Sequence, residues 1–418
     1  MNNVARSSPL AAPRRLVYAL PMGRIGLGRS AVVVALGFVQ ILAWGSSFYL
    51  PAVLAPAIVA DTGWPLDWII GGASTGLLVA ALVSPRVGRL IAARGGRPVL
   101  VTGSALFAAG LAALAAAPSL PLYLLAWAVL GLGMGCGLYD AAFAALGRLY
   151  GAAARGPMTS LTLFGGFAST VCWPLSALLL ETVGWRGTCL VYAGLHLGLA
   201  LPLQWIVLGR AVPDPDTPAP VASVSPDGVP AAIAHERLIL ALLGLALSIA
   251  AGIGAIVVVH LLIFLQARGV EFAVAVGLGT LFGPAQVGAR VVERLFGTHY
   301  HPIWTLIAAV LLMAIGLALL IASPAFAVAI ALYAAGYGIT WVARGTLPLA
   351  LFGPRRFPVL IGRLALPSLI AQALAPALGA MLITRYGADV TIWALLVCAG
   401  ANMAIVAALS FFCRLSKR

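Results

Sequence analysis

The chain has 418 residues, of which 62% are apolar and only 9% are charged. Soluble domains carry about 25% charged residues, because their water-facing surface requires them. The composition therefore excludes a soluble enzyme, a disordered chain and a secreted disulfide scaffold, and it indicates an integral membrane protein. The net charge of +14 comes mostly from Arg at the ends of apolar runs, which is a topology signal and does not indicate nucleic-acid binding.

The first 29 residues contain five Arg and no acidic residue. They lack the apolar stretch of a secretory signal. We expect residues 1–29 to form a cytoplasmic tail that anionic lipids attract. A transit peptide for an organelle has a similar composition and stays open as an alternative.

Twelve apolar segments follow, each about as long as a membrane-spanning helix. A stretch rich in Pro and Asp, 209–235, separates them into two sets of six and is expected to be a cytoplasmic linker. We therefore expect six-helix bundles at 30–208 and 236–413 and a cytoplasmic tail at 414–418. The segments span 30–57, 67–86, 98–117, 120–147, 157–182, 186–208, 237–265, 271–292, 302–322, 325–352, 357–383 and 389–412.

The distribution of basic residues predicts the orientation. With the N-terminus inside, the predicted outer loops contain only three of the 25 basic residues, namely Arg186, Arg268 and Arg385. Cytoplasmic loops carry the excess of Arg and Lys. We therefore expect a multi-pass protein of the plasma (inner) membrane with both termini in the cytoplasm.

The two halves of the chain repeat each other at an offset of 204 residues. Arg86 falls on Arg290, and Asp140 falls on Arg344. Two bundles of the same topology imply a pseudo-two-fold axis along the membrane normal, with a binding site near the midplane between them. The predicted fold is an all-α membrane protein of twelve helices in two pseudo-symmetric bundles.

The loop between the second and third segments reads Gly88-Arg-Leu-Ile-Ala-Ala-Arg-Gly-Gly-Arg97. With the 6+6 topology it resembles the major facilitator superfamily, whose G-x-L-x-D-R-x-G-R-R loop it matches at Gly88, Leu90, Gly95 and Arg97. The resemblance implies the fold of that superfamily and secondary transport. Ala92 stands where the family has an Asp that anchors a charge relay to segment eleven, so this chain lacks the acidic member of that relay.

Further short motifs are similar to the monocarboxylate and oxalate–formate branch, which implies an organic anion as substrate. The motifs of drug–proton antiporters are absent from segments four and five, where Trp127 replaces an Arg. The motifs that carry the resemblance are Arg155-Gly-Pro, Gly165-Gly166, Pro174 and Gly184-Trp185-Arg186.

Polar and aromatic residues three or four apart form stripes that face one direction along a helix. In a membrane such a stripe faces protein or a water-filled cavity, and helix–helix packing is the alternative interpretation. One stripe in segment one consists of Gln40, Trp44, Ser47 and Pro51, and a second in segment ten consists of Tyr337, Trp341 and Arg344. A third stripe in segment five runs from Thr162 through Gly166 and Ser169 to Trp173. The predicted residues of the substrate cavity are Gln40, Trp44, Ser47, Tyr337, Trp341, Arg344 and Gln372.

Ionisable side chains inside a membrane need a partner or a function. We predict that Asp140 and Arg344 form a gate, with a static ion pair as the alternative. We also predict that Arg290 and Glu293 form a local pair on one helix, with a substrate site as the alternative. His260 either handles protons or makes a packing hydrogen bond, and His196 is expected to be structural. The predicted gate or coupling residues are Asp140, Arg344, Arg290, Glu293, Arg363 and His260.

The sequence thus predicts a secondary transporter of a small polar solute, an organic anion first, that works by alternating access. Protons or a counter-transported solute would couple the movement. Efflux of a drug or of an arsenite-like metalloid, the latter through Cys136, Cys172 and Cys189, is an alternative, and so is a solute receptor on the same fold. We expect a monomer in the lipid bilayer with no enzymatic activity, cofactor, metal site or nucleic-acid partner.

Overall fold

The computed structural model describes residues 26–212 and 235–415. Most of the predicted tail 1–29, most of the linker 209–235 and residues 416–418 lie outside the described residues. In the first half the helices are α1 (Arg29–Gly45), α2 (Leu50–Thr62), α3 (Leu66–Arg94), α4 (Gly96–Ala116), α5 (Leu120–Gly137), α6 (Tyr139–Tyr150), η1 (Gly151–Ala154), α7 (Arg155–Gly166), α8 (Ala168–Leu195), η2 (His196–Ala200) and α9 (Leu201–Arg210). In the second half they are α10 (Glu236–Ala267), α11 (Phe272–Gly279), α12 (Phe282–Phe296), η3 (Gly297–His299), α13 (Pro302–Ala322) and α14 (Phe326–Leu415).

Two apolar helical stretches, Leu120–Arg210 with 91 residues and Phe326–Arg414 with 89, are far too long for one membrane crossing. Glycines with positive φ divide each stretch into three passes. They are Gly151 (φ 54°) and Gly184 (71°) in the first, and Gly353 (74°) and Gly387 (85°) in the second. With the six shorter apolar stretches, the described residues make the twelve passes that the sequence predicts.

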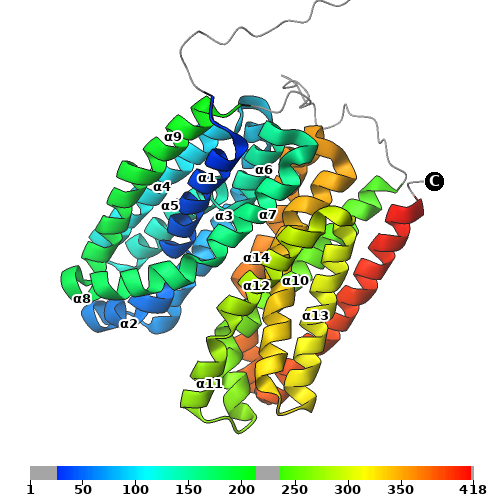
Figure 1. The fold of residues 1–418 in the computed structure, drawn as a ribbon. Coiled ribbons are helices and arrows are strands. Elements are labelled where there is room, and N and C mark those ends of the chain that lie inside the picture. The colour runs from blue at the N-terminus through cyan, green and yellow to red at the C-terminus, as the bar shows by residue number, and fades with distance from the viewer. Residues whose placement is uncertain (1–25, 213–234, 416–418) are drawn as a thin grey trace, which may run out of the picture.

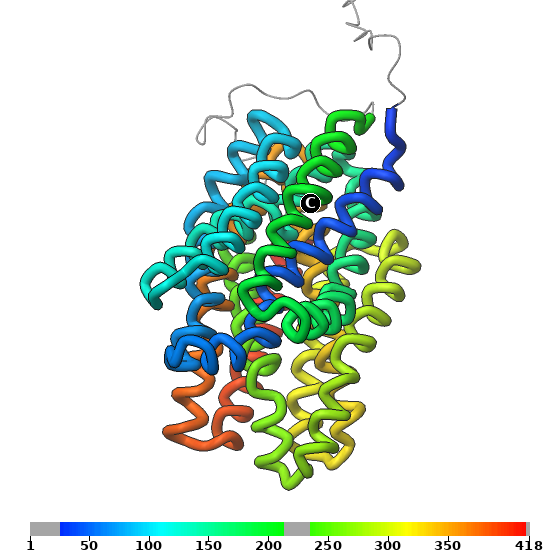
Figure 2. Tube along the Cα trace, turned by 90° about the vertical axis from the view of Figure 1, so that its left-hand side faces the viewer, coloured from blue at the N-terminus to red at the C-terminus, as the bar shows by residue number. Residues whose placement is uncertain are grey.

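The helices run between two faces of the molecule (Figures 1 and 2). At one face Leu27 donates a backbone hydrogen bond to Arg210, and the His235 ring lies beside that of Phe412. We call this end the terminal face and the other end the opposite face. The two bundles meet near the terminal face and diverge towards the opposite face, where α2 and α8 lie far from α11 (Figure 1).

Glycines allow α3 and α14 to approach closely across the bundle interface. A Cβ at Gly88 would collide with the Pro358 carbonyl, and one at Gly362 would lie 2.5 Å from the Ser84 carbonyl oxygen. Small residues let helix backbones pack in this way. Gly88 of the loop motif is therefore a packing residue between the bundles.

The rest of the loop motif is arranged around Arg side chains. Arg148 donates a hydrogen bond to the backbone carbonyl of Ala92, the position where the family pattern has Asp. Arg97 stacks on Trp205 with its guanidinium carbon 3.8 Å from the ring centroid. Gly95 adopts a φ of 89°, and Leu90 is exposed. A backbone oxygen thus accepts from Arg148 where the family supplies a carboxylate.

Candidate substrate cavity between the bundles

A cavity of about 620 Å³ lies between the two bundles. Its wall residues towards the opposite face, such as Ala52, Trp173 and Thr280, are exposed, whereas Tyr139 and Arg290 at its other end are buried. The cavity is therefore open to the opposite face and closed towards the terminal face. Its lining consists of Trp44, Phe48, Tyr49, Ala52, Val53, Tyr139, Gly165, Gly166, Ser169, Thr170, Trp173, Pro174, Ala177, Val258, Gly279, Thr280, Phe282, Gly283, Pro284, Gln286, Arg290, Tyr337, Trp341 and Gln372.

Three aromatic rings from both bundles close the inner end of the cavity. The ring centroids of Trp44 and Trp341 are 5.5 Å apart, those of Trp44 and Tyr139 are 5.1 Å apart, and those of Tyr139 and Trp341 are 5.7 Å apart. Such separations are typical of favourable aromatic pairs. We call Trp44, Tyr139 and Trp341 the aromatic floor.

Beyond the aromatic floor an ion pair joins the bundles. Arg344 Nε donates to Asp140 Oδ1 at 2.7 Å and Nη2 donates to Oδ2 at 2.8 Å, which is a bidentate pair. The side chain of Arg344 is 4% exposed and that of Asp140 is 15% exposed. Arg344 does not line the main cavity, contrary to its prediction as a cavity residue, because its charge is engaged by Asp140 across the bundle interface.

Arg290 lines the cavity and has only neutral hydrogen-bond partners. Nε donates to the Gly338 carbonyl (3.0 Å), Nη1 to the Thr162 carbonyl (2.9 Å) and Nη2 to Gln286 Oε1 (3.0 Å). The residue is 3% exposed, and within the described part of the chain no ion pair joins it to a carboxylate. Among the described lining residues it is the one with a formal charge.

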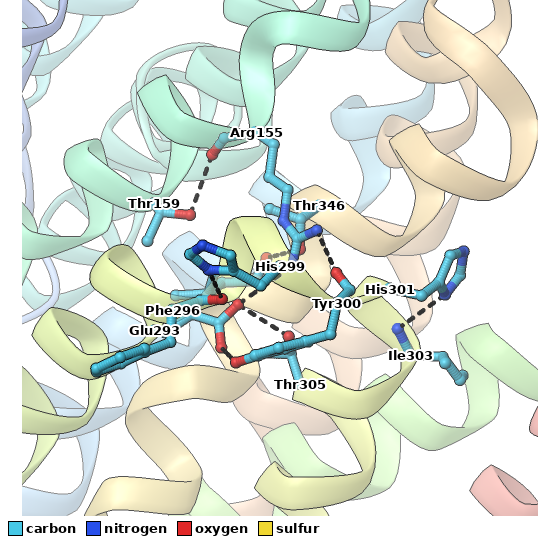
Figure 3. Close-up of polar contacts among 11 residues, drawn as sticks. Arg155, Thr159, Glu293, Phe296, His299, Tyr300, His301, Ile303, Thr305 and Thr346 are labelled. Carbon is cyan, nitrogen blue, oxygen red and sulfur yellow. Dashed lines mark hydrogen bonds and ion pairs between the residues drawn. The ribbon is translucent and has the colours of Figure 1, made fainter.

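Glu293 turns away from Arg290, so the predicted local pair is wrong. Its carboxylate accepts from Tyr300 Oη and from Thr305 Oγ1 (2.9 Å), and Arg155 Nη2 lies 3.5 Å away (Figure 3). Arg155 also donates to the Tyr300 carbonyl at 2.7 Å (Figure 3). Burial and donation to Glu293 raise the pKa of Tyr300, which lies in the loop between two passes, to about 12. Arg290 thus pairs with two backbone carbonyls and the Gln286 amide, and Glu293 pairs with two hydroxyl groups and the Arg155 guanidinium.

The structure brings four of the seven predicted cavity residues to the cavity: Trp44, Tyr337, Trp341 and Gln372. Two further predictions are wrong. Gln40 donates to the Gly137 carbonyl (2.7 Å), and Ser47 donates to the Ala43 carbonyl (2.6 Å), so neither side chain lines the cavity.

In the described part of the chain, the two remaining predicted gate residues do not join the Asp140–Arg344 pair. His260 Nε2 donates to the Pro376 carbonyl at 3.0 Å, which is a packing contact between α10 and α14. Arg363 is exposed. His196 is buried and bonds to Ser46 Oγ at 2.8 Å, in keeping with a structural role.

The sequence did not indicate Tyr139 or Gln286, and for Arg290 it favoured a local pair over the alternative of a substrate site, although Arg290 lines the cavity. Tyr139 follows a break at Leu138, whose backbone is extended and interrupts the helical period between α5 and α6. A signal existed for the wall formed by α7 and α8, because the third polar stripe contributes Gly166, Ser169 and Trp173.

The thiols do not form a site. Cys172 and Cys189 are buried, Cys136 is half-buried, and none of the three is among the lining residues of the cavity. The described residues contain no group of three His, Cys, Asp or Glu side chains that could bind a metal ion. The structure therefore offers no preformed thiol site for a metalloid.

The human organic anion transporter MFSD10 (TETRAN) superposes with a TM-score of 0.72 at 15% identity, over 91% of this chain and 100% of that chain. FucP, the E. coli fucose:proton symporter, superposes in its outward conformation with a TM-score of 0.72 at 14% identity, over 91% and 98% of the two chains. The proton:xylose symporter XylE gives a TM-score of 0.64 at 13% identity, over 90% and 94%.

A search of curated proteins finds no match. The model of the Major Facilitator Superfamily matches residues 36–300, which is more than half of the chain. With the twelve passes and the cavity between the bundles, this match shows that the chain belongs to the major facilitator superfamily.

Proposed function

We propose that the protein is a secondary active transporter that moves a small organic anion by alternating access. The observation that carries the proposal is Arg290, a buried guanidinium in the cavity wall with no carboxylate partner among the described residues. A buried charge without a counter-ion is costly, and a bound anion would supply the missing charge.

The remaining walls suit the apolar body of such an anion. Aromatic side chains, among them Trp44, Tyr139, Trp173, Tyr337 and Trp341, contribute to the cavity wall. A volume of about 620 Å³ is in the range of sites for small molecules.

We propose that the terminal face is cytoplasmic, because most of the basic residues lie at that end of the passes. The structure would then be the outward-open state. The described lining contains no carboxylate or imidazole, which favours exchange for a second anion over proton coupling. Efflux of a metalloid loses support, because the thiols do not line the cavity.

A binding screen tests the substrate class. Purified protein would be heated with benzoate, lactate, fucose, xylose and tetraethylammonium, and a ligand of the folded state raises the melting temperature. We expect the carboxylates to raise it, and we expect Arg290→Gln to weaken their binding about tenfold to a hundredfold, because charge-assisted hydrogen bonds are lost.

The matched control is Arg363→Gln, which removes an exposed Arg and should leave the affinity unchanged. Uptake of the same carboxylates into proteoliposomes then separates a transporter from a receptor, which binds without transport. If only the sugars or the cation stabilise the protein, the anion proposal is wrong.

A further inference from the structure

Arg290 joins the two bundles as well as lining the cavity. It lies on α12, and its Nη1 donates to the Thr162 carbonyl of α7 at 2.9 Å. The same carbonyl accepts from Tyr139 Oη of the aromatic floor at 3.3 Å. Arg290 and Thr162 are both buried. The formally charged group of the described lining is therefore part of the contact that closes the cavity towards the terminal face.

The next turn of α12 continues this contact. Glu293 lies 3.5 Å from Arg155 of α7, and Arg294 Nε donates to Ser160 Oγ of α7 at 2.9 Å. Residues three or four apart lie on one face of a helix. Arg290 is thus the cavity end of a polar contact between α7 and α12. These helices belong to different bundles, so rocking of the bundles to open the terminal face separates them and breaks the hydrogen bond from Arg290 to α7.

The charge of Arg290 makes this step depend on the contents of the cavity. In the state described, three neutral acceptors and the opening to solvent stabilise the guanidinium. Closure of both ends, which every change of access passes through, expels water and leaves the charge with fewer acceptors. No ion pair with a carboxylate balances it within the described part of the chain. An empty closed cavity would enclose an uncompensated cation, which is strongly unfavourable.

A bound carboxylate removes this penalty. It supplies one negative charge, so the occupied cavity is neutral. Its oxygens also accept charge-assisted hydrogen bonds from the guanidinium, in place of the carbonyl that α7 withdraws.

We infer that the protein is an obligatory exchanger. The bundles pass from one open state to the other only with an anion bound to Arg290, so each anion that enters is balanced by one that leaves. This inference rests on the proposed function and specifies how the same site controls the transport cycle.

Efflux from proteoliposomes that contain the full-length protein tests the inference. The vesicles are loaded with radiolabelled lactate at pH 8 and diluted into potassium sulfate, either alone or with lactate or benzoate. Valinomycin with potassium on both sides holds the membrane potential at zero, so that charge movement does not limit net efflux. We expect efflux to be at least about tenfold faster with an external carboxylate, because the empty cavity must otherwise close around a charge. Protein-free liposomes give the passive flux to subtract.

Two substitutions of Arg290 separate its charge from its hydrogen bonds. Arg290→Gln makes the empty cavity neutral and should lower the ratio of the two efflux rates to less than about threefold. Arg290→Lys retains the charge and should keep the ratio near that of the parent. The control is Arg363→Gln, which removes an exposed Arg outside the cavity lining and should leave the ratio unchanged.

A measurement without any carboxylate covers the case in which Arg290→Gln no longer transports lactate. Ala52 lies in the cavity wall towards the opposite face, so the labelling rate of Ala52→Cys, in a background without the native Cys, reports how often that end is open. This Cys should react more slowly in Arg290→Gln than in Arg290→Lys or the parent, because only the neutral empty cavity closes. Equal rates in the Gln and Lys variants would overturn the inference.

The outcomes distinguish the two proposals. If the parent releases lactate into sulfate alone as fast as into lactate, or if the Gln and Lys variants have the same ratio, obligatory exchange is overturned and anion transport stands. If the lactate flux never exceeds that of protein-free liposomes, the proposed function itself is wrong.

Discussion

Two Arg side chains near the cavity differ in whether a carboxylate balances their charge. Arg344 is paired with Asp140 in a bidentate contact, so the pair is neutral towards the cavity. Arg290 has only two carbonyl groups and the Gln286 amide as partners, so its charge remains available to a ligand. The difference lies in one carboxylate contributed by the other bundle.

Gly166 provides the space that Arg290 occupies. A Cβ at this position would lie 2.5 Å from Arg290 Nη1 and 3.1 Å from Val287 Cγ2. We expect Gly166→Ala to displace the guanidinium and to weaken carboxylate binding about tenfold, as the loss of one charge-assisted hydrogen bond would. Titration with benzoate measures the affinity of the variant for a carboxylate.

Gly194→Ala is the control for this substitution, because a Cβ at Gly194 has nothing within 4 Å. It should leave the affinity unchanged. Equal affinities for Gly166→Ala and the unaltered protein would show that Arg290 does not bind the anion in the position described.

The helices of the bundle interface form two different seams. Along α7 and α12 the contacts are polar: Arg290 with the Thr162 carbonyl, Arg155 with Glu293, and Arg294 Nε with Ser160 Oγ at 2.9 Å. Along α3 and α14 they are close backbone contacts at Gly88 and Gly362. Opening the terminal face must break charge-assisted hydrogen bonds on one seam and only packing contacts on the other.

The ion pair between α6 and α14 lies at symmetry-related positions, since Asp140 and Arg344 are 204 residues apart. Removal of one partner of a buried pair typically costs about 3–5 kcal/mol. We expect Asp140→Asn and Arg344→Gln each to destabilise the state described and to favour opening at the terminal face. The measurement is labelling of a reporter Ala52→Cys at the cavity mouth, in a background without the native Cys, which should slow in both variants.

The charge swap is the decisive control for the pair. Asp140→Arg combined with Arg344→Asp reverses the two charges and should restore part of the labelling rate. A swap that labels no faster than either single variant, or single variants that label like the parent, would contradict a gate.

The sequence predicted the membrane-spanning helices better than it predicted how far the cavity extends along each helix. Apolar runs predicted the twelve passes, because about 20 apolar residues are needed for each crossing. Gln40 lies four residues before Trp44 on the same helix, but it packs against Gly137 beyond the aromatic floor. Helical spacing indicates the direction of a side chain and not where a cavity ends. The partners of Arg290 include backbone carbonyls of two other helices, and such contacts leave no pattern in the sequence.

At the scale of the whole molecule, the two bundles are joined by side-chain contacts from the aromatic floor to the terminal face. The Asp140–Arg344 pair, the edge-to-face contact of Trp44 with Trp341 and the polar seam of α7 and α12 all connect residues on either side of the stretch 213–234. These contacts are independent of chain connectivity. The residues 213–234 themselves contribute Pro, Asp and small side chains and few that could form a core.

We therefore expect the two halves to remain associated when the chain is cut within 213–234. A protease site inserted there, cleaved after purification in detergent, should give two fragments that elute together on size exclusion and bind benzoate with the affinity of the uncut protein. The control is the same insertion without protease, which reports any effect of the inserted residues. In the uncut chain the linker holds the two halves at a high effective concentration, and cleavage removes this advantage. Association of the fragments should therefore be measured at a series of dilutions. Fragments that separate at micromolar concentration, or that lose ligand binding while still associated, would show that the linker contributes to the cavity or to the interface.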